Sequence, residues 1–289
     1  MNILSRLQAK WRGFKQITRL DKPIGIYLLL WPTFWALWVA ANGWPSSHLL
    51  FVFTFGVIIM RSAGCVINDF ADRHVDGKVQ RTELRPLVTG IITSKEAIGI
   101  FVCLLSAAFA LVLTLKTSTI LLSIVAVILA TIYPFMKRYT HLPQVVLGAA
   151  FSWGMIMAFE EAYSEITLVA WLLFIANMLW TVAYDTIYAM VDKNDDIHIG
   201  VKSTAILFGE HDKRIIALLQ LLTLGCLFTV GELLAFGWPY HVALIISAGL
   251  FSYQQVLISE RNREKCFQAF LNNHWVGAIV FAGIFIEHL

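Results

Sequence analysis

The chain has 289 residues, of which 58% are hydrophobic, 13% are aromatic and only 14% are charged, and its mean hydropathy is +0.71. An ordinary soluble domain is roughly 25% charged, so this composition excludes a soluble enzyme, a secreted disulfide scaffold and a disordered chain. The net charge of +3 is spread over several short segments and indicates no nucleic-acid partner. The composition is typical of a protein that crosses a membrane many times.

The N-terminal segment alternates apolar and basic side chains over residues 1–20 at helical spacing. This pattern predicts an amphipathic helix that lies on the membrane surface, and the segment does not read as a signal peptide. We therefore divide the chain into an interfacial segment, 1–22, and a single membrane domain, 23–289. The four cysteines lack the spacing of a metal site or redox pair and are expected to be packing residues.

The rest of the chain contains apolar stretches of about 20 residues, the length that spans a bilayer. We predict an all-α membrane protein with nine transmembrane helices, at about 24–42, 49–67, 96–115, 118–136, 144–162, 166–185, 214–234, 238–258 and 270–287. If the N-terminus is cytoplasmic, nearly all Lys and Arg residues fall on the cytoplasmic side. The positive-inside rule then places the C-terminus outside. The longest loops, 69–95 and 186–213, are both predicted to be cytoplasmic.

An acidic cluster follows the second predicted span. Asn68, Asp72 and Asp76 are spaced by four residues, so on a helix they share one face. Oxygen ligands on one face suit a hard cation such as Mg²⁺, which keeps some of its waters and takes further oxygens from a substrate phosphate.

A second acidic cluster follows the sixth span. Asp192 and Asp196 are again four residues apart, and Asp185 lies seven residues before Asp192 on the same face. Four spans separate the two clusters, so both lie on the same side of the membrane. Spans 1–4 and 5–8 then form two pseudo-repeats, with one helix left over.

The alternative to a metal site is a solvated polar surface. Such surfaces usually mix Glu with Lys, whereas here every acid is Asp and stands at a membrane helix end. Facing carboxylates also repel each other unless cations lie between them. We therefore expect the two clusters to bind metal.

Basic and phenolic side chains stand where a metal-bound diphosphate would need them, and Arg and Lys are the usual phosphate partners. Positive-inside anchoring explains some of them equally well. The candidates are Lys78, Arg81, Arg85, Tyr133, Lys137, Arg138 and Lys202.

Arg61 differs from these residues because it lies within a predicted span, about two turns from Asn68. An intramembrane arginine costs several kcal/mol and should have an anionic partner. Either Asp185 of the protein or a carboxylate of the substrate could be that partner.

Together, Asn68-Asp69-x-x-Asp72-x-x-x-Asp76, Arg81-Thr82, Arg85-Pro86 and Asp192-x-x-x-Asp196 resemble the motifs of the intramembrane aromatic prenyltransferases. Residues 21–32, 133–143 and 202–209 resemble the bacterial branch of that family that acts on 4-hydroxybenzoate. The resemblance covers nearly the whole chain.

This resemblance implies nine helices around a central cavity, with a cytoplasmic polar cap and an opening to lipid. It implies Mg²⁺ bound by Asn68, Asp72, Asp76, Asp192 and Asp196, diphosphate bound at Lys137 beside Tyr133, and an aromatic carboxylate bound by Arg61. It leaves the roles of Asp69 and Asp195 undecided.

The function that follows is Mg²⁺-dependent transfer of a polyprenyl group from a polyprenyl diphosphate to the carbon beside the hydroxyl of 4-hydroxybenzoate, in ubiquinone biosynthesis. The resemblance further implies an octaprenyl chain and the bacterial inner membrane. The acidic clusters would serve catalysis through the metal. Asp185 is the candidate that assists the phenol or takes its ring proton.

Three other functions remain open. A sibling prenyltransferase would use another acceptor, but a carboxylate-binding Arg61 favours a benzoate. A cation-coupled transporter fits intramembrane charge, but its site is expected near mid-membrane. A CDP-alcohol phosphotransferase also uses Mg²⁺ and aspartates, but its signature motif is absent and it needs no second cluster.

Overall fold

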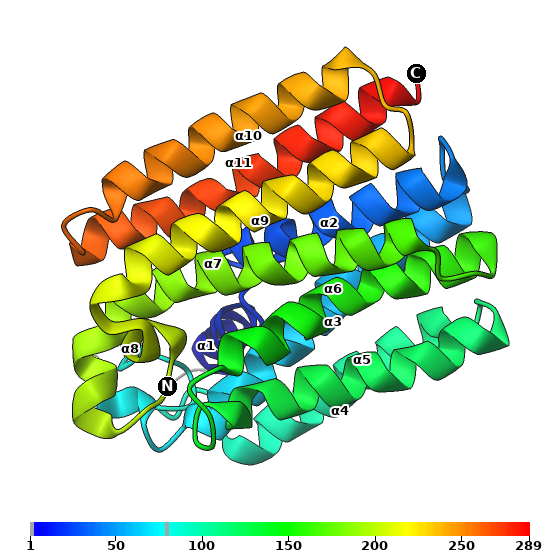
Figure 1. Ribbon diagram of the computed structural model, residues 1–289. Coiled ribbons are helices and arrows are strands. Elements are labelled where there is room, and N and C mark those ends of the chain that lie inside the picture. The colour runs from blue at the N-terminus through cyan, green and yellow to red at the C-terminus, as the bar shows by residue number, and fades with distance from the viewer. Residues whose placement is uncertain (1–2, 79–80) are drawn as a thin grey trace.

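The computed structural model describes residues 3–78 and 81–289, and these residues form helices and turns without a strand. Eleven α-helices lie in these ranges, most of them running along one direction as a bundle (Figure 1). They are α1 Ile3–Ile17, α2 Ile24–Ala41, α3 Ser47–Asp72, α4 Ser94–Val112, α5 Thr117–Met136, α6 Pro143–Tyr163, α7 Leu168–Ile199, α8 Thr204–Phe208, α9 Asp212–Leu233, α10 Trp238–Leu257 and α11 Arg263–Glu287. Two short 3₁₀ turns, η1 Asp76–Lys78 and η2 Gly209–His211, accompany them.

The helices confirm an all-α membrane protein. Within the described residues, eight helical segments are long and apolar enough to cross a membrane, with α8 to α9 counted as one. The eighth predicted span, 238–258, forms α10, which packs against α9 and α11, but it is not among those eight segments. The count of nine spans is therefore not confirmed, and the two pseudo-repeats stay a prediction.

The boundaries of α3 and α4 follow from local capping chemistry. The Ser46 side chain accepts a hydrogen bond from the Leu49 amide and starts α3. Thr93 and Glu96 form a reciprocal capping box that starts α4. These contacts satisfy amides that have no partner within the helix. They set where α3 begins and where the loop after α3 returns to the bundle as α4.

The two long predicted loops turn out differently from each other. Helix α3 ends at Asp72, so the expectation that Asn68, Asp72 and Asp76 share one helix face is wrong for Asp76, which lies in η1. The segment 186–213 is not a loop, because α7 continues without a break to Ile199 and α8 follows. Gly200 ends α7 in a left-handed conformation, with φ of 74°, which glycine adopts without steric cost.

The centre of the bundle is aromatic. The fully buried rings of Trp35 and Trp180 stack with centroids 5.5 Å apart. The Trp35 indole donates to the Gly277 carbonyl at 3.0 Å, and the Trp180 indole donates to Asn273 Oδ1 at 2.8 Å. Buried indole N–H groups need such partners. These contacts join α2, α7 and α11 around one core.

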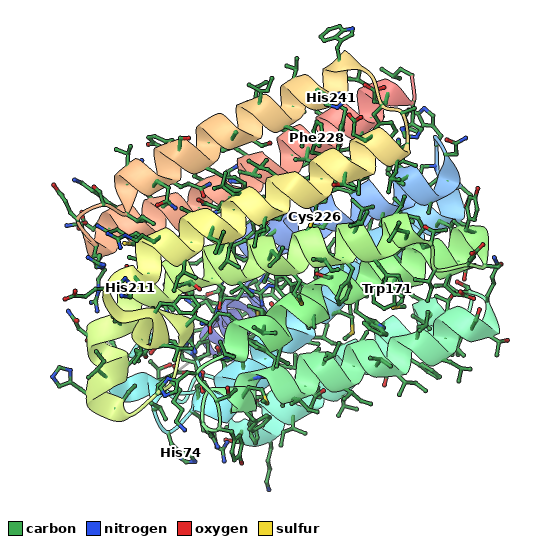
Figure 2. The ribbon with its side chains drawn as sticks, in the orientation of Figure 1. His74, Trp171, His211, Cys226, Phe228 and His241 are labelled. Atoms are coloured by element: carbon green, nitrogen blue, oxygen red, sulfur yellow. The ribbon has the colours of Figure 1, made fainter. Side chains whose placement is uncertain are left out.

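The polar ends of several helices gather on one side of the bundle. In Figure 1 the C-terminal part of α7, helix α8 and the loop after α3 lie together at the same end, beside α1. The histidines labelled in Figure 2 do not gather there: His74 and His211 lie toward that end but apart, and His241 lies at the other.

Helix α1 is amphipathic, as predicted. Ile17 is buried with Val66 and Ile92, whereas Leu7 and Trp11 are exposed. Lys10 pairs with Glu96 at the surface. Placement of this helix in the membrane interface stays a prediction, as does the division at residue 22.

Candidate active site

A polar pocket of about 150 Å³ lies at the end of the bundle where α3, α5 and α7 end. It brings together most of the residues that the sequence analysis selected: Asn68, Asp72, Asp76, Arg81, Tyr133, Lys137, Asp185, Asp192, Asp196 and Lys202. The two acidic clusters therefore face one another across a single pocket. An arrangement with the clusters on opposite sides of the membrane is excluded.

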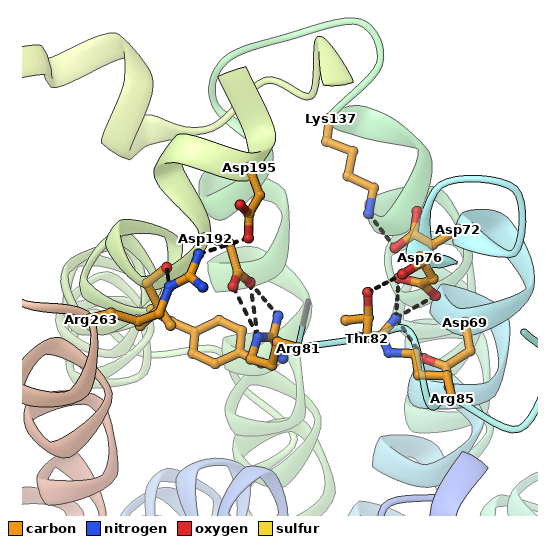
Figure 3. Close-up of polar contacts among 12 residues, drawn as sticks. Asp69, Asp72, Asp76, Arg81, Thr82, Arg85, Lys137, Asp192, Asp195 and Arg263 are labelled. Atoms are coloured by element: carbon orange, nitrogen blue, oxygen red, sulfur yellow. Dashed lines mark hydrogen bonds and ion pairs between the residues drawn. The ribbon is translucent and has the colours of Figure 1, made fainter. Parts of the chain in front are cut away.

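The first cluster is neutralised by side chains from its own loop and from α5. Lys137, which caps the C-terminus of α5, forms an ion pair with Asp72. Arg85 donates to both carboxylate oxygens of Asp76, at 2.7 and 2.9 Å. Burial nevertheless raises the pKa of the Asp76 carboxyl to about 6, although Arg85 opposes this shift. Figure 3 shows these contacts on one wall of the site.

The second cluster is reached from across the pocket. Arg81, from the loop after α3, donates through Nε to both oxygens of Asp192, at 3.0 and 3.1 Å (Figure 3). Its guanidinium also bonds to the Tyr188 hydroxyl and stacks over that ring, 4.7 Å from the centroid. Asp196 lines the pocket and has no ion pair among the described residues. The loop after α3 thus supplies a cation to each cluster.

The oxygen-bearing side chains of the polar pocket are candidate metal ligands. Among the described residues, no group of three or more His, Cys, Asp or Glu side chains converges as a metal site does. The chemistry of the donors nevertheless fits Mg²⁺, because the amide of Asn68 and several aspartate carboxylates line one pocket and hard cations prefer oxygen ligands. Three of the carboxylates are held by Arg81, Arg85 and Lys137, so metal binding requires these pairs to rearrange.

The two acids whose roles were undecided have protein partners. Asp69 is 1% exposed and pairs with Arg19 at 2.8 Å and Arg85 at 3.1 Å. Asp195 pairs with Arg263 at 2.7 Å. Arg263 also donates to the Val191 carbonyl at 2.7 Å. Each acid therefore forms ion pairs that stabilise the helix end carrying its cluster, Asp69 at the end of α3 and Asp195 near the end of α7.

The remaining cationic candidates are placed less centrally. Lys202 lines the pocket, and its Nζ donates to the Tyr139 carbonyl at 3.3 Å. Arg138 is exposed and donates to the Ala71 carbonyl. Lys78 lies in η1, but its side chain is outside the described residues. The assignment of these three to substrate stays a prediction.

An apolar cavity of about 180 Å³ lies deeper in the bundle, between α2, α3, α4, α5 and α6. Its walls are almost entirely apolar, and Arg61 is the charged residue that lines it. Tyr133 lines both this cavity and the polar pocket, so the two spaces adjoin at its ring. A ligand with an anionic head and an apolar body can occupy both.

Tyr188 and Gln144 also line the polar pocket, although neither was predicted as a site residue from the sequence. Tyr188 stands four residues before Asp192, and this helical spacing was the available signal. Gln144 lies one residue after Pro143, which starts α6, and its Oε1 accepts from the Thr204 amide at 3.2 Å. No spacing relates Gln144 to the acidic clusters, so only the fold could reveal it.

Residues 29–283 match the model of the UbiA prenyltransferase family. The chain belongs to this family. It is 68% identical over 287 residues to a 4-hydroxybenzoate octaprenyltransferase of Colwellia psychrerythraea, covering 99% of this chain and 100% of the relative. It is 55% identical over 284 residues to the enzyme of that name from Yersinia pseudotuberculosis, covering 98% and 99%. The resemblance proposed from the motifs is confirmed.

Solved structures of UbiA homologues share the fold. One from Aeropyrum pernix aligns with a TM-score of 0.80 at 24% identity, covering 92% of this chain and 98% of the other. One from Archaeoglobus fulgidus, bound to DMAPP and Mg²⁺, aligns with a TM-score of 0.74 at 18% identity, covering 96% and 99%. These UbiA relatives therefore support the helical architecture described above.

Proposed function

We propose that this UbiA-family protein transfers a polyprenyl group, octaprenyl by analogy with its named relatives, from its diphosphate to 4-hydroxybenzoate. The product, 3-polyprenyl-4-hydroxybenzoate, is the intermediate that gives ubiquinone its tail. The observation that carries the proposal is the pair of acidic clusters lining one pocket that adjoins an apolar cavity at Tyr133.

The polar pocket would hold the diphosphate. Asn68, Asp72, Asp76, Asp192 and Asp196 supply the oxygen ligands for Mg²⁺. When bound, the metal places positive charge beside the leaving diphosphate. Lys137 and Arg81, which hold Asp72 and Asp192, would turn to phosphate oxygens, and Lys202 lies within the same pocket. The structure of a relative bound to DMAPP and Mg²⁺ supports this assignment.

The reaction exchanges one bond for another. The bond between the allylic carbon and the diphosphate oxygen breaks, and its electron pair leaves with the diphosphate. The allylic cation is attacked by the ring carbon beside the phenolic hydroxyl, and that carbon then loses its proton. The apolar cavity walls exclude water from the cation. Asp185, which lines the polar pocket, would accept the proton.

Arg61 would bind the carboxylate of the acceptor. Of its two possible partners, the substrate is supported because no described carboxylate of the protein forms an ion pair with Arg61. Its Nε is buried without a hydrogen-bond partner among the described residues. A buried guanidinium without an anionic partner is costly, and a benzoate carboxylate would supply that partner through charge-assisted hydrogen bonds to the Nη groups.

Localisation follows from the charge pattern and the site. The pocket lies at the end of the bundle to which the basic loops belong, so we place it and the N-terminus on the cytoplasmic side of a bacterial inner membrane. The exposed apolar side chains of α1, including Leu7 and Trp11, would insert among the lipids at that surface.

The test is mass spectrometry of the product formed by the purified protein in liposomes. We expect a prenylated 4-hydroxybenzoate that disappears with EDTA and returns with added Mg²⁺. Several prenyl diphosphates offered together report the preferred chain length. A sibling activity would give the adduct of another aromatic acceptor, whereas substrate flux without a new covalent product would indicate a transporter.

A further inference from the structure

The side chain of Arg61 is held by three features of its surroundings. Its Nη1 donates to Cys65 Sγ at 2.8 Å, one helical turn along α3. Its guanidinium carbon lies 5.7 Å from the centroid of the Phe151 ring of α6. The third side is the backbone of α2 at Gly25, the second residue of that helix.

Gly25 is the point of closest approach. A Cβ atom placed on Gly25 would lie 2.3 Å from Arg61 Nε and 2.5 Å from Nη2. These distances are shorter than any non-bonded contact that the two groups could keep. The space that the guanidinium occupies therefore exists because residue 25 has no side chain.

This contact involves the edge of the guanidinium that forms paired hydrogen bonds. Nε and Nη2 are the atoms nearest Gly25, while Nη1 is engaged by Cys65. Nε has no protein partner among the described residues. The Nε–Nη2 edge therefore faces the backbone of α2, which closes it to a ligand, and the remaining N–H groups of the two Nη atoms are those left for the apolar cavity that Arg61 lines.

We propose that Gly25 is a positioning residue that selects for a carboxylated aromatic acceptor, acting through Arg61. The inference rests on the proposed function, because it takes Arg61 as the receptor of the benzoate carboxylate. A methyl group at position 25 displaces the guanidinium from its seat. The acceptor then loses its charge-assisted pairing, whereas the diphosphate pocket, which Arg61 does not line, is unchanged.

The first measurement is the steady-state kinetics of Gly25→Ala. We expect KM for 4-hydroxybenzoate to rise about tenfold or more, the range expected for hydrogen bonds to a charged group, while KM for the prenyl diphosphate stays within about twofold. The preference for 4-hydroxybenzoate over the uncharged 4-hydroxybenzamide should fall by the same factor. A rise of both KM values, or an unchanged preference, would overturn the proposal.

The second measurement is a double-mutant cycle, which shows whether Gly25 acts through Arg61. In an Arg61→Ala background the collision is absent, so Gly25→Ala should change neither KM nor the melting temperature further. Equal effects of Gly25→Ala in both backgrounds would contradict the proposed coupling. The melting temperatures keep this cycle decisive even if Gly25→Ala is inactive or the acceptor is not a benzoate.

Two glycines serve as matched controls. Gly99 of α4 has open space where a Cβ would be, so Gly99→Ala should behave as wild type. Gly277 of α11 lies in the packed core, where a Cβ atom placed on it would be 2.9 Å from the Cβ atom of Trp31. Gly277→Ala should lower the melting temperature without changing the acceptor preference. If it also shifts that preference, the effect of Gly25 is one of general packing.

If the wild-type protein forms no adduct with 4-hydroxybenzoate, the proposed function fails, independently of the cycle.

Discussion

The two acidic clusters carry similar residues at similar spacing but are built differently. The second lies on one uninterrupted helix, so Asp185, Asp192 and Asp196 keep the phase that their spacing predicts. The first is divided, because α3 ends at Asp72 and Asp76 lies in η1. The second therefore forms a fixed wall, and the first is assembled from a helix end and a loop.

The clusters also differ in where their cations originate. Arg85, from the loop after α3, binds Asp76 of its own cluster, while Arg81, from the same loop, crosses the pocket to Asp192. That one loop thus neutralises both walls. The first half of the chain therefore supplies both carboxylates and cationic side chains to the site, whereas α7 supplies mainly carboxylates.

The largest expected effect tests whether both walls are required. Asp72→Ala and Asp192→Ala should each lower product formation about a thousandfold or more, because each removes charge that positions the metal and leaving group. The measurement is prenylated product formed by membranes that contain equal amounts of each variant. Glu83→Gln is the control, since Glu83 is an exposed acid in the loop that carries Arg81 and Arg85. Near wild-type activity in either aspartate variant would show that a single wall suffices.

A second effect should appear in stability, on the side of the first cluster. Asp69→Ala leaves Arg19 without an ion-pair partner and Arg85 with Asp76 alone, and breaking a buried pair costs about 3 kcal/mol or more. We expect a lower free energy of unfolding in detergent, measured by denaturant titration. The addition of Arg19→Ala should recover part of this loss if the unpaired charge of Arg19 is its cause, because Arg85 keeps its pair with Asp76.

Binding of the diphosphate should depend on Lys137 more modestly. Lys137→Gln removes one cation from the pocket, and we expect KM for the prenyl diphosphate to rise about tenfold, the effect of one charge-assisted hydrogen bond. KM for 4-hydroxybenzoate should change little. Lys22→Gln, at an exposed position outside the pocket, is the control. A change confined to KM for 4-hydroxybenzoate would contradict the assignment of Lys137 to the diphosphate and would place it beside the acceptor.

The smallest effect is expected at the outer acid of the second cluster. Asp195 and Arg263 are 28% and 41% exposed in their side chains, and pairs of this kind contribute about 0–1 kcal/mol. Asp195→Ala should therefore lower the free energy of unfolding far less than Asp69→Ala. Equal losses of unfolding free energy from the two substitutions would show that the buried pair of Asp69 and the exposed pair of Asp195 stabilise the two clusters to the same extent.

Much of the site could be predicted from the sequence because helical spacing is a local property. The step of four residues between Asp192 and Asp196 sets their common face wherever the helix lies. The same reasoning failed at Asp76, since helix termination after Asp72 was not visible in the spacing. It also took 186–213 for a loop, because charged residues there lowered the hydropathy although the helix continued to Ile199.

The sequence by itself determined the membrane class, the family, and the residue types that can hold a diphosphate and a divalent cation, because composition and spacing express these properties directly. Only the tertiary structure decided which cation meets which carboxylate, that Asp69 and Asp195 serve as anchors, and that Gly25 makes the space for Arg61. Those contacts join segments far apart along the chain. Their geometry depends on how helices pack, which no local pattern records.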